Sequence, residues 1–329
     1  MAEDPRSGTV YWIDHYVVGT DDLKRWTEFQ SKVIGARSGD NFRVIAFQDI
    51  TPCCHHGAML SPEPLPPSAG LGKGLPRHGL FIRQQDVDVH LRRLDDLGVR
   101  HLDPMRTSAE GEEGISVAWE DPDGNQFEFW APDRLPEGAM AGASPVGVGR
   151  ISHGVYESLD LQRAADHFAT YCALEPRQAT DVSADTLVLR LVGGARVVYK
   201  KVDTMSQRTG GFGKLGAAHA ALVVRDEDFW PNYERMWDGV PEWEWDAKQR
   251  RFVGAGTELP ARTSRHGSPA GERWFDIRGR GDDWYDWDTN CFHFMGGVPH
   301  DRQFDQYEPH TMESVSYTHL RAHETGRNL

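Results

Sequence analysis

The chain has 329 residues, of which 39% are hydrophobic and 26% charged, and this composition is typical of a globular protein large enough for two domains. The formal net charge of −14 disfavours nucleic acid and anionic membrane surfaces as partners, so we expect a small-molecule partner. There is no apolar run as long as a membrane span, and the first residues, MAEDPRSGTVYW, lack a signal-peptide pattern, so we expect a cytoplasmic protein.

The first predicted elements are a strand, VYWIDHYVV at residues 10–18, and a helix at residues 21–34. The helix shows an apolar stripe of Leu23, Trp26, Phe29 and Val33, and Gly35 follows as a stop signal. The next strand-like run is FRVIAFQDI. This order of strand, helix and further strands defines a unit that the rest of the chain repeats.

Three more copies of the unit follow in chain order. The second has the strand RHGLFI and a helix at 86–97 that ends at Gly98, the third has ISHGVYES and a helix at 161–174, and the fourth has AAHAALVV and a helix at 227–237. Each copy continues into strand-like runs such as ISVAWED, TLVLRLV and RWFDIRG. The sequence therefore predicts an α+β protein of four strand-helix-strands (βαβββ) modules.

The four modules, taken two at a time, predict two tandem cup-like domains at residues 8–134 and 149–300. Residues 135–148, rich in Gly, Ala and Pro, form the expected linker. An insertion at about 240–269 interrupts the second domain and is either a surface hairpin or a lid. Residues 301–329 form a tail, and we interpret VSYTHLRAHET and the residues after it, 315–329, as a non-native translation of a sequencing adapter.

The second module closes with WEDPDGNQFEFW. Its Asp, Pro, Gly and Asn residues predict a tight turn before a strand in which Glu128 lies between Phe127 and Phe129. Considered without the rest of the sequence, Glu128 is more typical of the solvent-exposed face of an edge strand. However, YDWDTNCFHFMG repeats the frame and puts His293 at the equivalent position, and this repetition favours a metal-binding role.

Four histidines occupy the same position on the first strand of the four modules, namely His15, His78, His153 and His219. With consecutive modules paired, we predict that His15, His78 and Glu128 converge in the first domain and bind a metal. Two imidazoles and one carboxylate suit Fe(II) or Mn(II) and leave one side of the metal open. The second set, His153, His219 and His293, lacks a carboxylate, so it is either a degenerate copy or a different metal site.

These residues resemble the vicinal oxygen chelate superfamily, which includes glyoxalases, bleomycin resistance proteins and extradiol dioxygenases. The resemblance rests on the repeated module, the four histidines and DPDGNQFEF, and it covers about residues 8–300. Four modules resemble the two-domain extradiol ring-cleaving dioxygenases most. The resemblance also implies an active-site acid/base at His56 within PCCHHGAML, with His55 as the alternative if the strand slips by one residue.

The resemblance predicts a metal-dependent extradiol-type dioxygenase that cleaves a catechol-like aromatic substrate with O2. Two departures from the ring-cleaving signature are Ala118, where the family has Tyr, and the absence of a His at residues 109–111. Two alternatives stay open: a glyoxalase-type lyase or isomerase, which would use Zn(II) or Ni(II), and a non-catalytic binding protein of the resistance type. A homo-oligomer is compatible with all three readings.

Overall fold

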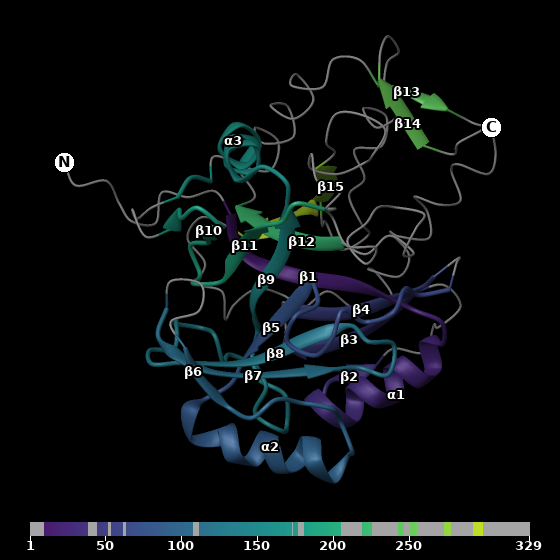
Figure 1. Ribbon diagram of the computed structural model, residues 1–329, viewed down its shortest axis with the longest axis vertical. Coiled ribbons are helices and arrows are strands. Elements are labelled where there is room, and N and C mark those ends of the chain that lie inside the picture. Colours follow the sequence, from purple (N-terminus) through teal and green to yellow (C-terminus); the bar gives the residue numbers. More distant parts are fainter. Residues whose placement is uncertain are drawn as a thin grey trace.

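A computed structural model describes residues 10–38, 45–51, 54–61, 64–107, 112–172, 174–176, 181–204, 219–225, 243–246, 251–254, 273–277 and 292–298 (Figure 1). The predicted fourth helix at 227–237 and the tail at 301–329 lie outside these residues. Among the described residues, no helix is long and apolar enough to span a membrane.

Strands dominate the described part. Its helices are α1 (Leu23–Ile34), the short 3-10 helix η1 (Gln84–Asp86), α2 (Val87–Asp96) and α3 (Leu161–Cys172). Its strands are β1 (Val10–Thr20), β2 (Arg37–Ser38), β3 (Ile45–Thr51), β4 (Cys54–Leu60), β5 (Arg77–Phe81), β6 (Met105–Thr107), β7 (Gly114–Glu120), β8 (Gln126–Pro132), β9 (Ile151–Ser158), β10 (Thr186–Arg190), β11 (Arg196–Lys201), β12 (His219–Arg225), β13 (Trp243–Asp246), β14 (Arg251–Gly254), β15 (Arg273–Ile277) and β16 (Phe292–Val298).

The strands form two seven-stranded mixed sheets with matching topology. The first sheet has the order β15-β16-β12-β1-β4-β3-β2, and the second has the order β10-β11-β9-β5-β8-β7-β6. In both, the first strand of a module pairs in parallel with its last strand and antiparallel with the first strand of another module. Within the insertion, β13 pairs with β14 in a separate two-stranded sheet.

The predicted pairing of consecutive modules is not confirmed. Hydrogen bonds join the first module to the fourth through β1 and β12, and the second to the third through β5 and β9. The physical reason is that the first strand is an open edge of each module, and any other such edge can satisfy its backbone groups. The division into domains at residues 8–134 and 149–300 stays a prediction. Hydrophobic residues buried in both sheets form one continuous cluster, so the core gives no boundary between two domains.

The predicted end of α1 at Gly35 is confirmed, whereas the helix begins at Leu23 rather than at residue 21. The Asp22 side chain accepts a hydrogen bond from Arg25 N at the start, and Gly35 adopts φ 67° at the end, a conformation in which a Cβ would be strained. Helix α2 packs beside α1, since the Arg93 side chain donates to the Lys32 carbonyl at 2.7 Å. Figure 1 shows both helices on the lower side of the large sheets, with α3 on the upper side.

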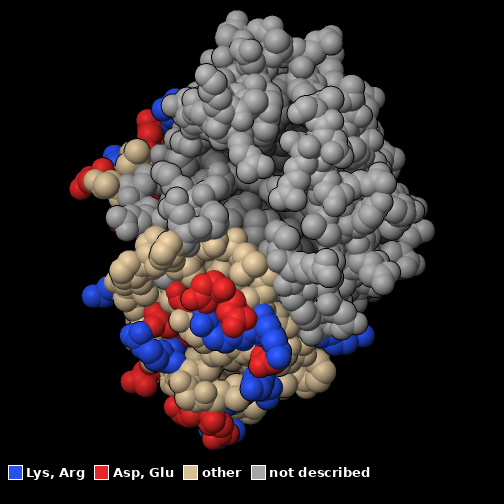
Figure 2. Space-filling view, turned by 90° about the vertical axis from the view of Figure 1, so that its right-hand side faces the viewer, with Lys and Arg blue, Asp and Glu red and all other residues tan. Residues whose placement is uncertain are grey.

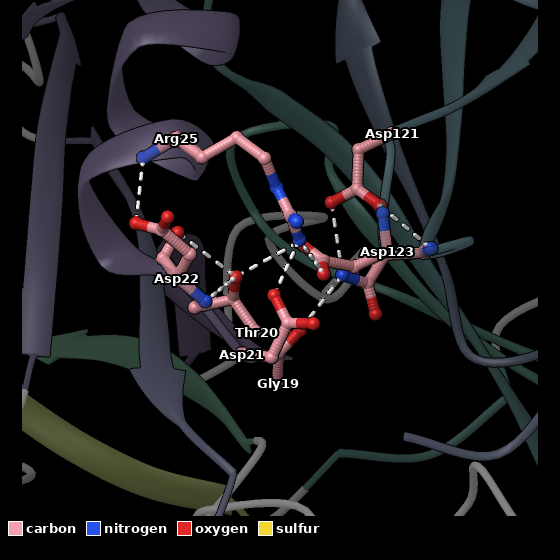
Figure 3. Close-up of polar contacts among 8 residues, drawn as sticks. Gly19, Thr20, Asp21, Asp22, Arg25, Asp121 and Asp123 are labelled. Carbon is pink, nitrogen blue, oxygen red and sulfur yellow. Dashed lines mark hydrogen bonds and ion pairs between the residues drawn. The ribbon is translucent and has the colours of Figure 1, made fainter. Parts of the chain in front are cut away.

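The turn before β8 is tied to the end of β1 (Figure 3). The Asp121 carboxyl group accepts hydrogen bonds from the backbone N of Asp123 and of Asn125, both at 2.9 Å, and the predicted turn is thereby confirmed. The Asn125 side chain donates to the Gly19 carbonyl at 2.9 Å, and Thr20 Oγ1 donates to Asp123 Oδ2 at 2.8 Å. These contacts fix the start of β8, the strand that carries Glu128, against the first module.

Candidate functional site

Glu128 lies in a buried polar cluster on one face of the second sheet. Its side chain is 4% exposed, with Oε2 2.9 Å from Arg77 Nε and 3.6 Å from His153 Nε2. The second distance is too long for a hydrogen bond. Gly79 makes room for this arrangement, since a Cβ there would lie 2.2 Å from His153 Cε1.

The environment of Glu128 favours its ionised form. Burial alone would raise its pKa, but the attraction of His153 and of Arg77 outweighs burial and lowers the pKa to about 2. Glu128 is therefore a carboxylate at neutral pH. Its Oε1 and the Nε2 of His153 have no hydrogen-bond partner among the described residues.

His78 lies on the opposite face of the same sheet. Register pairs His78 with Phe127 and Gly79 with Glu128, and consecutive strand residues point to opposite faces. The His78 ring stacks on Tyr16 with ring centroids 4.1 Å apart and an interplanar angle of 6°. Burial, together with the nearby His153, lowers the pKa of His78 to about 3, so its ring is neutral at physiological pH.

His56 belongs to the same aromatic cluster as His78. Its ring makes an edge contact with Tyr16 at 4.6 Å, stacks on Trp26 at 4.8 Å and lies 5.3 Å from Phe127. Burial, reinforced by His78, lowers the pKa of His56 well below 6.5. Neither ring nitrogen has a hydrogen-bond partner among the described residues. His56 is thus a neutral base, but it lies on the Phe127 side rather than the Glu128 side, and its acid/base role stays a prediction.

His15 points away from this aromatic cluster, because it is the strand neighbour of Tyr16. Its Nδ1 lies 2.7 Å from Asp14 Oδ2 in a buried hydrogen bond. Backbone register pairs His15 with His55, whose side chain lies outside the described part. The side chains of His219 and His293 lie outside it as well.

The structure therefore does not bring His15, His78 and Glu128 together. In the described part of the chain, no group of three or more His, Cys, Asp or Glu side chains is placed to hold a metal. The structure instead brings Glu128 beside His153 of the third module. Sequence reasoning identified His153 as an equivalent histidine but paired it with the fourth module, and it missed Arg77, whose only sequence signal is a charge at the start of an apolar strand.

The Glu128–His153 pair fits two positions of a divalent metal site. A carboxylate and an imidazole are donors that Fe(II), Mn(II) and Zn(II) accept, and both residues offer a buried atom without a hydrogen-bond partner in the described part. His78 directly precedes Gly79, which pairs with both Glu128 and His153. The His78 ring therefore lies on the opposite face of the sheet from these two side chains.

Comparison with known proteins finds a family match for the first part of the chain and similar folds among solved structures. Residues 12–129 match the model of the Glyoxalase/Bleomycin resistance protein/Dioxygenase superfamily. A search of curated proteins finds no match. Among solved structures, a protein from Bacillus subtilis assigned as a dioxygenase is similar at TM-score 0.59 and 15% identity, over 97% of both chains. Glyoxalase I from Zea mays is similar at TM-score 0.54 and 13% identity, over 87% of this chain and 92% of that chain.

At these identities the structural matches show the fold alone, a sheet-dominated α+β fold with curled sheets of the glyoxalase/dioxygenase kind. The family model matches residues 12–129, less than half of the chain, and this segment therefore resembles the glyoxalase/bleomycin resistance/dioxygenase superfamily, the vicinal oxygen chelate proteins. Members of this superfamily are metal-dependent, and they include dioxygenases and glyoxalase I.

Proposed function

We propose that this chain is a metal-dependent dioxygenase that cleaves a catechol-like aromatic substrate with O2, and that Glu128 and His153 hold its metal. The observation that carries the proposal is the buried pair of Glu128 Oε1 and His153 Nε2, two donor atoms without hydrogen-bond partners among the described residues. Fe(II) is the proposed metal and Mn(II) the alternative, since both accept mixed imidazole and carboxylate ligands.

The choice of a dioxygenase within the superfamily rests on two supports. The similarity to the Bacillus subtilis protein extends over 97% of both chains, more than the similarity to glyoxalase I. In addition, the low pKa of Glu128, about 2, makes its carboxylate a good ligand but a weak base. A lyase of the glyoxalase type needs a base that removes a proton from a carbon atom of the substrate.

The residues around the pair have separable roles. Arg77 holds Glu128 Oε2 and so orients the carboxylate. Gly79 leaves space for the His153 ring, and Trp130 makes an edge contact with that ring at 6.2 Å, which restricts its rotation and excludes water. A bound metal would supply Lewis acidity, which lowers the pKa of the substrate oxygens that chelate it.

The proposal is tested with protein purified without oxygen and loaded with Fe(II). Addition of catechol and O2 should give oxygen uptake and a ring-cleaved product, and Glu128→Gln should abolish both. His15→Ala is the matched control, because it removes a buried histidine of the sequence-predicted set, and it should keep activity. Turnover of a hemithioacetal with Zn(II) or Ni(II) and no oxygen uptake would support a lyase instead, and stoichiometric ligand binding without metal would support a binding protein.

A further inference from the structure

Strand β9 carries a β-bulge directly before His153. Gly79 of β5 pairs with His153. The next residue of β5 pairs with Ile151, so Ser152 is an extra residue in this pairing. In a regular strand Ser152 and His153 would point to opposite faces, but a bulge re-aims the side chain of the extra residue. The bulge therefore allows both side chains to lie together.

The Ser152 side chain forms a hydrogen bond with the His153 ring. Ser152 Oγ lies 3.0 Å from His153 Nδ1, and both residues are fully buried. Gly79 leaves space for this contact, because a Cβ there would lie 2.5 Å from each of these two atoms. Since the contact is buried, the Ser152 hydroxyl rather than bulk water is the partner of Nδ1.

The same arrangement occurs at the equivalent histidine of the first module. Ile13 and His15 pair with consecutive residues of β12, so Asp14 is the extra residue of a bulge in β1. Asp14 Oδ2 lies 2.7 Å from His15 Nδ1. In both modules the residue in the bulge thus bonds to Nδ1 of the histidine that follows it. The repetition with two different residue types indicates that holding Nδ1 is a property of this position.

The bond to Nδ1 decides which ring nitrogen is available to a metal. An imidazole that binds a metal through one nitrogen carries its proton on the other, and a partner for that proton fixes the tautomer and the orientation of the ring. A serine hydroxyl can accept this proton's hydrogen bond. His153 Nε2 lies 3.6 Å from Glu128 Oε2 and has no hydrogen-bond partner among the described residues.

We propose that Ser152 is a positioning residue of the metal site, which accepts a hydrogen bond from Nδ1–H of His153 and so presents Nε2 to the metal beside Glu128. The inference rests on the proposed function of the same site. Ser152 does not touch the metal, and its effect passes through the orientation and basicity of the imidazole. Removing such a partner typically weakens metal binding by about 10- to 100-fold.

The test compares Zn(II) dissociation constants of the unsubstituted protein, Ser152→Ala and His153→Ala. Zinc is redox-inert and accepts imidazole and carboxylate ligands. The chain carries a net charge of −14, and Figure 2 shows Asp and Glu side chains on the described part of the visible face, where exposed carboxylates can bind zinc weakly. The titration therefore counts the site that His153→Ala removes, and Ser152→Ala should bind zinc there about 10- to 100-fold more weakly.

Ser144→Ala is the matched control. It removes the hydroxyl of another buried serine, which accepts a hydrogen bond from Val148 N at 3.2 Å, and it should leave the zinc affinity unchanged. An equal loss of affinity in Ser144→Ala and Ser152→Ala would overturn the inference, because the loss would then come from the stability of the protein as a whole.

A second measurement reads the tautomer of His153 directly. In the zinc-loaded unsubstituted protein with isotopically labelled histidine, NMR should find the ring proton of His153 on Nδ1 and in slow exchange with water. In Ser152→Ala this proton should exchange faster, a change that a purely structural role would not produce. A proton on Nε2 in the unsubstituted protein would overturn the inference even if Ser152→Ala failed to fold.

The two proposals for this site fail in different ways. If Ser152→Ala binds zinc as tightly as the unsubstituted protein while His153→Ala loses the site, the inference about Ser152 is wrong and the proposed metal pair stands. If His153→Ala binds zinc no more weakly than the unsubstituted protein, His153 is not a ligand, and the proposed function and the inference fail together.

Discussion

The buried ion pair between Arg77 and Glu128 gives a direct prediction about the metal-free protein. The side chains are 15% and 4% exposed, with Arg77 Nε 2.9 Å from Glu128 Oε2. Removing one partner of a buried pair leaves a charge in a dry environment and costs about 3–5 kcal/mol. The pKa of Glu128, lowered from 4.5 to about 2, leads to a similar figure, since this difference stabilises the ionised form by about 3 kcal/mol.

Glu128→Gln should therefore lower the free energy of unfolding by about 3 kcal/mol. Arg77→Met should cost less, because His153 also stabilises the Glu128 carboxylate and remains in this variant. The double variant should lose less than the sum of the two, because it leaves neither charge unpaired. The measurement is urea unfolding at pH 7 after treatment with a chelator, so that metal binding does not contribute.

Arg106→Met serves as the reference for an exposed ion pair and should cost less than about 1 kcal/mol. A Glu128→Gln variant as stable as the unsubstituted protein would refute the reasoning, as would strictly additive single effects. Either result would mean that the Arg77–Glu128 contact is exchanged for water at no cost. The conclusion that this cluster is buried and dry would then be wrong.

Three further predictions concern the elements that position the site. Thr20→Val removes the hydrogen bond to Asp123 and should lower the free energy of unfolding by about 2 kcal/mol in urea, whereas a loss under 0.5 kcal/mol would show that the bond is dispensable. Burial and the nearby Asp123 raise the pKa of Asp121 to about 7, so the folded carboxyl stays protonated where the unfolded one ionises. Stability should consequently fall as the pH rises from about 4 through 7, and Asp121→Asn should flatten this dependence in unfolding measured at pH 5.5 and pH 8, which an unchanged slope would contradict. Gly79→Ala puts a Cβ into the His153 ring and should cost about 1–3 kcal/mol and weaken metal binding in a titration, so normal metal affinity would show that His153 is not a ligand.

The local elements could be predicted from the sequence because their signals are local. The apolar stripe and Gly35 predicted the end of α1, and the Asp121–Asn125 turn was predicted from its Asp, Pro, Gly and Asn residues. The four equivalent histidines also indicated the repeated module. In each of these cases the deciding contacts lie within a few residues of one another.

The assembly of the site could not be predicted in the same way. Which open edge strand pairs with which depends on contacts between modules, and the modules carry similar edges. The face on which a strand residue lies depends on register. His78 pairs with Phe127 rather than with Glu128, and this offset of one residue puts His78 and Glu128 on opposite faces of the sheet.

The metal content of four proteins tests the central claim most directly. The unsubstituted protein, Glu128→Ala, His153→Ala and His15→Ala are purified without oxygen, loaded with Fe(II), desalted and analysed for iron, and circular dichroism checks that each variant is folded. A centre built on Glu128 and His153 predicts that both of these variants lose the iron, since each loses a ligand, while His15→Ala keeps it. Iron retained in His153→Ala but lost in His15→Ala would contradict this account and restore the set predicted from the sequence.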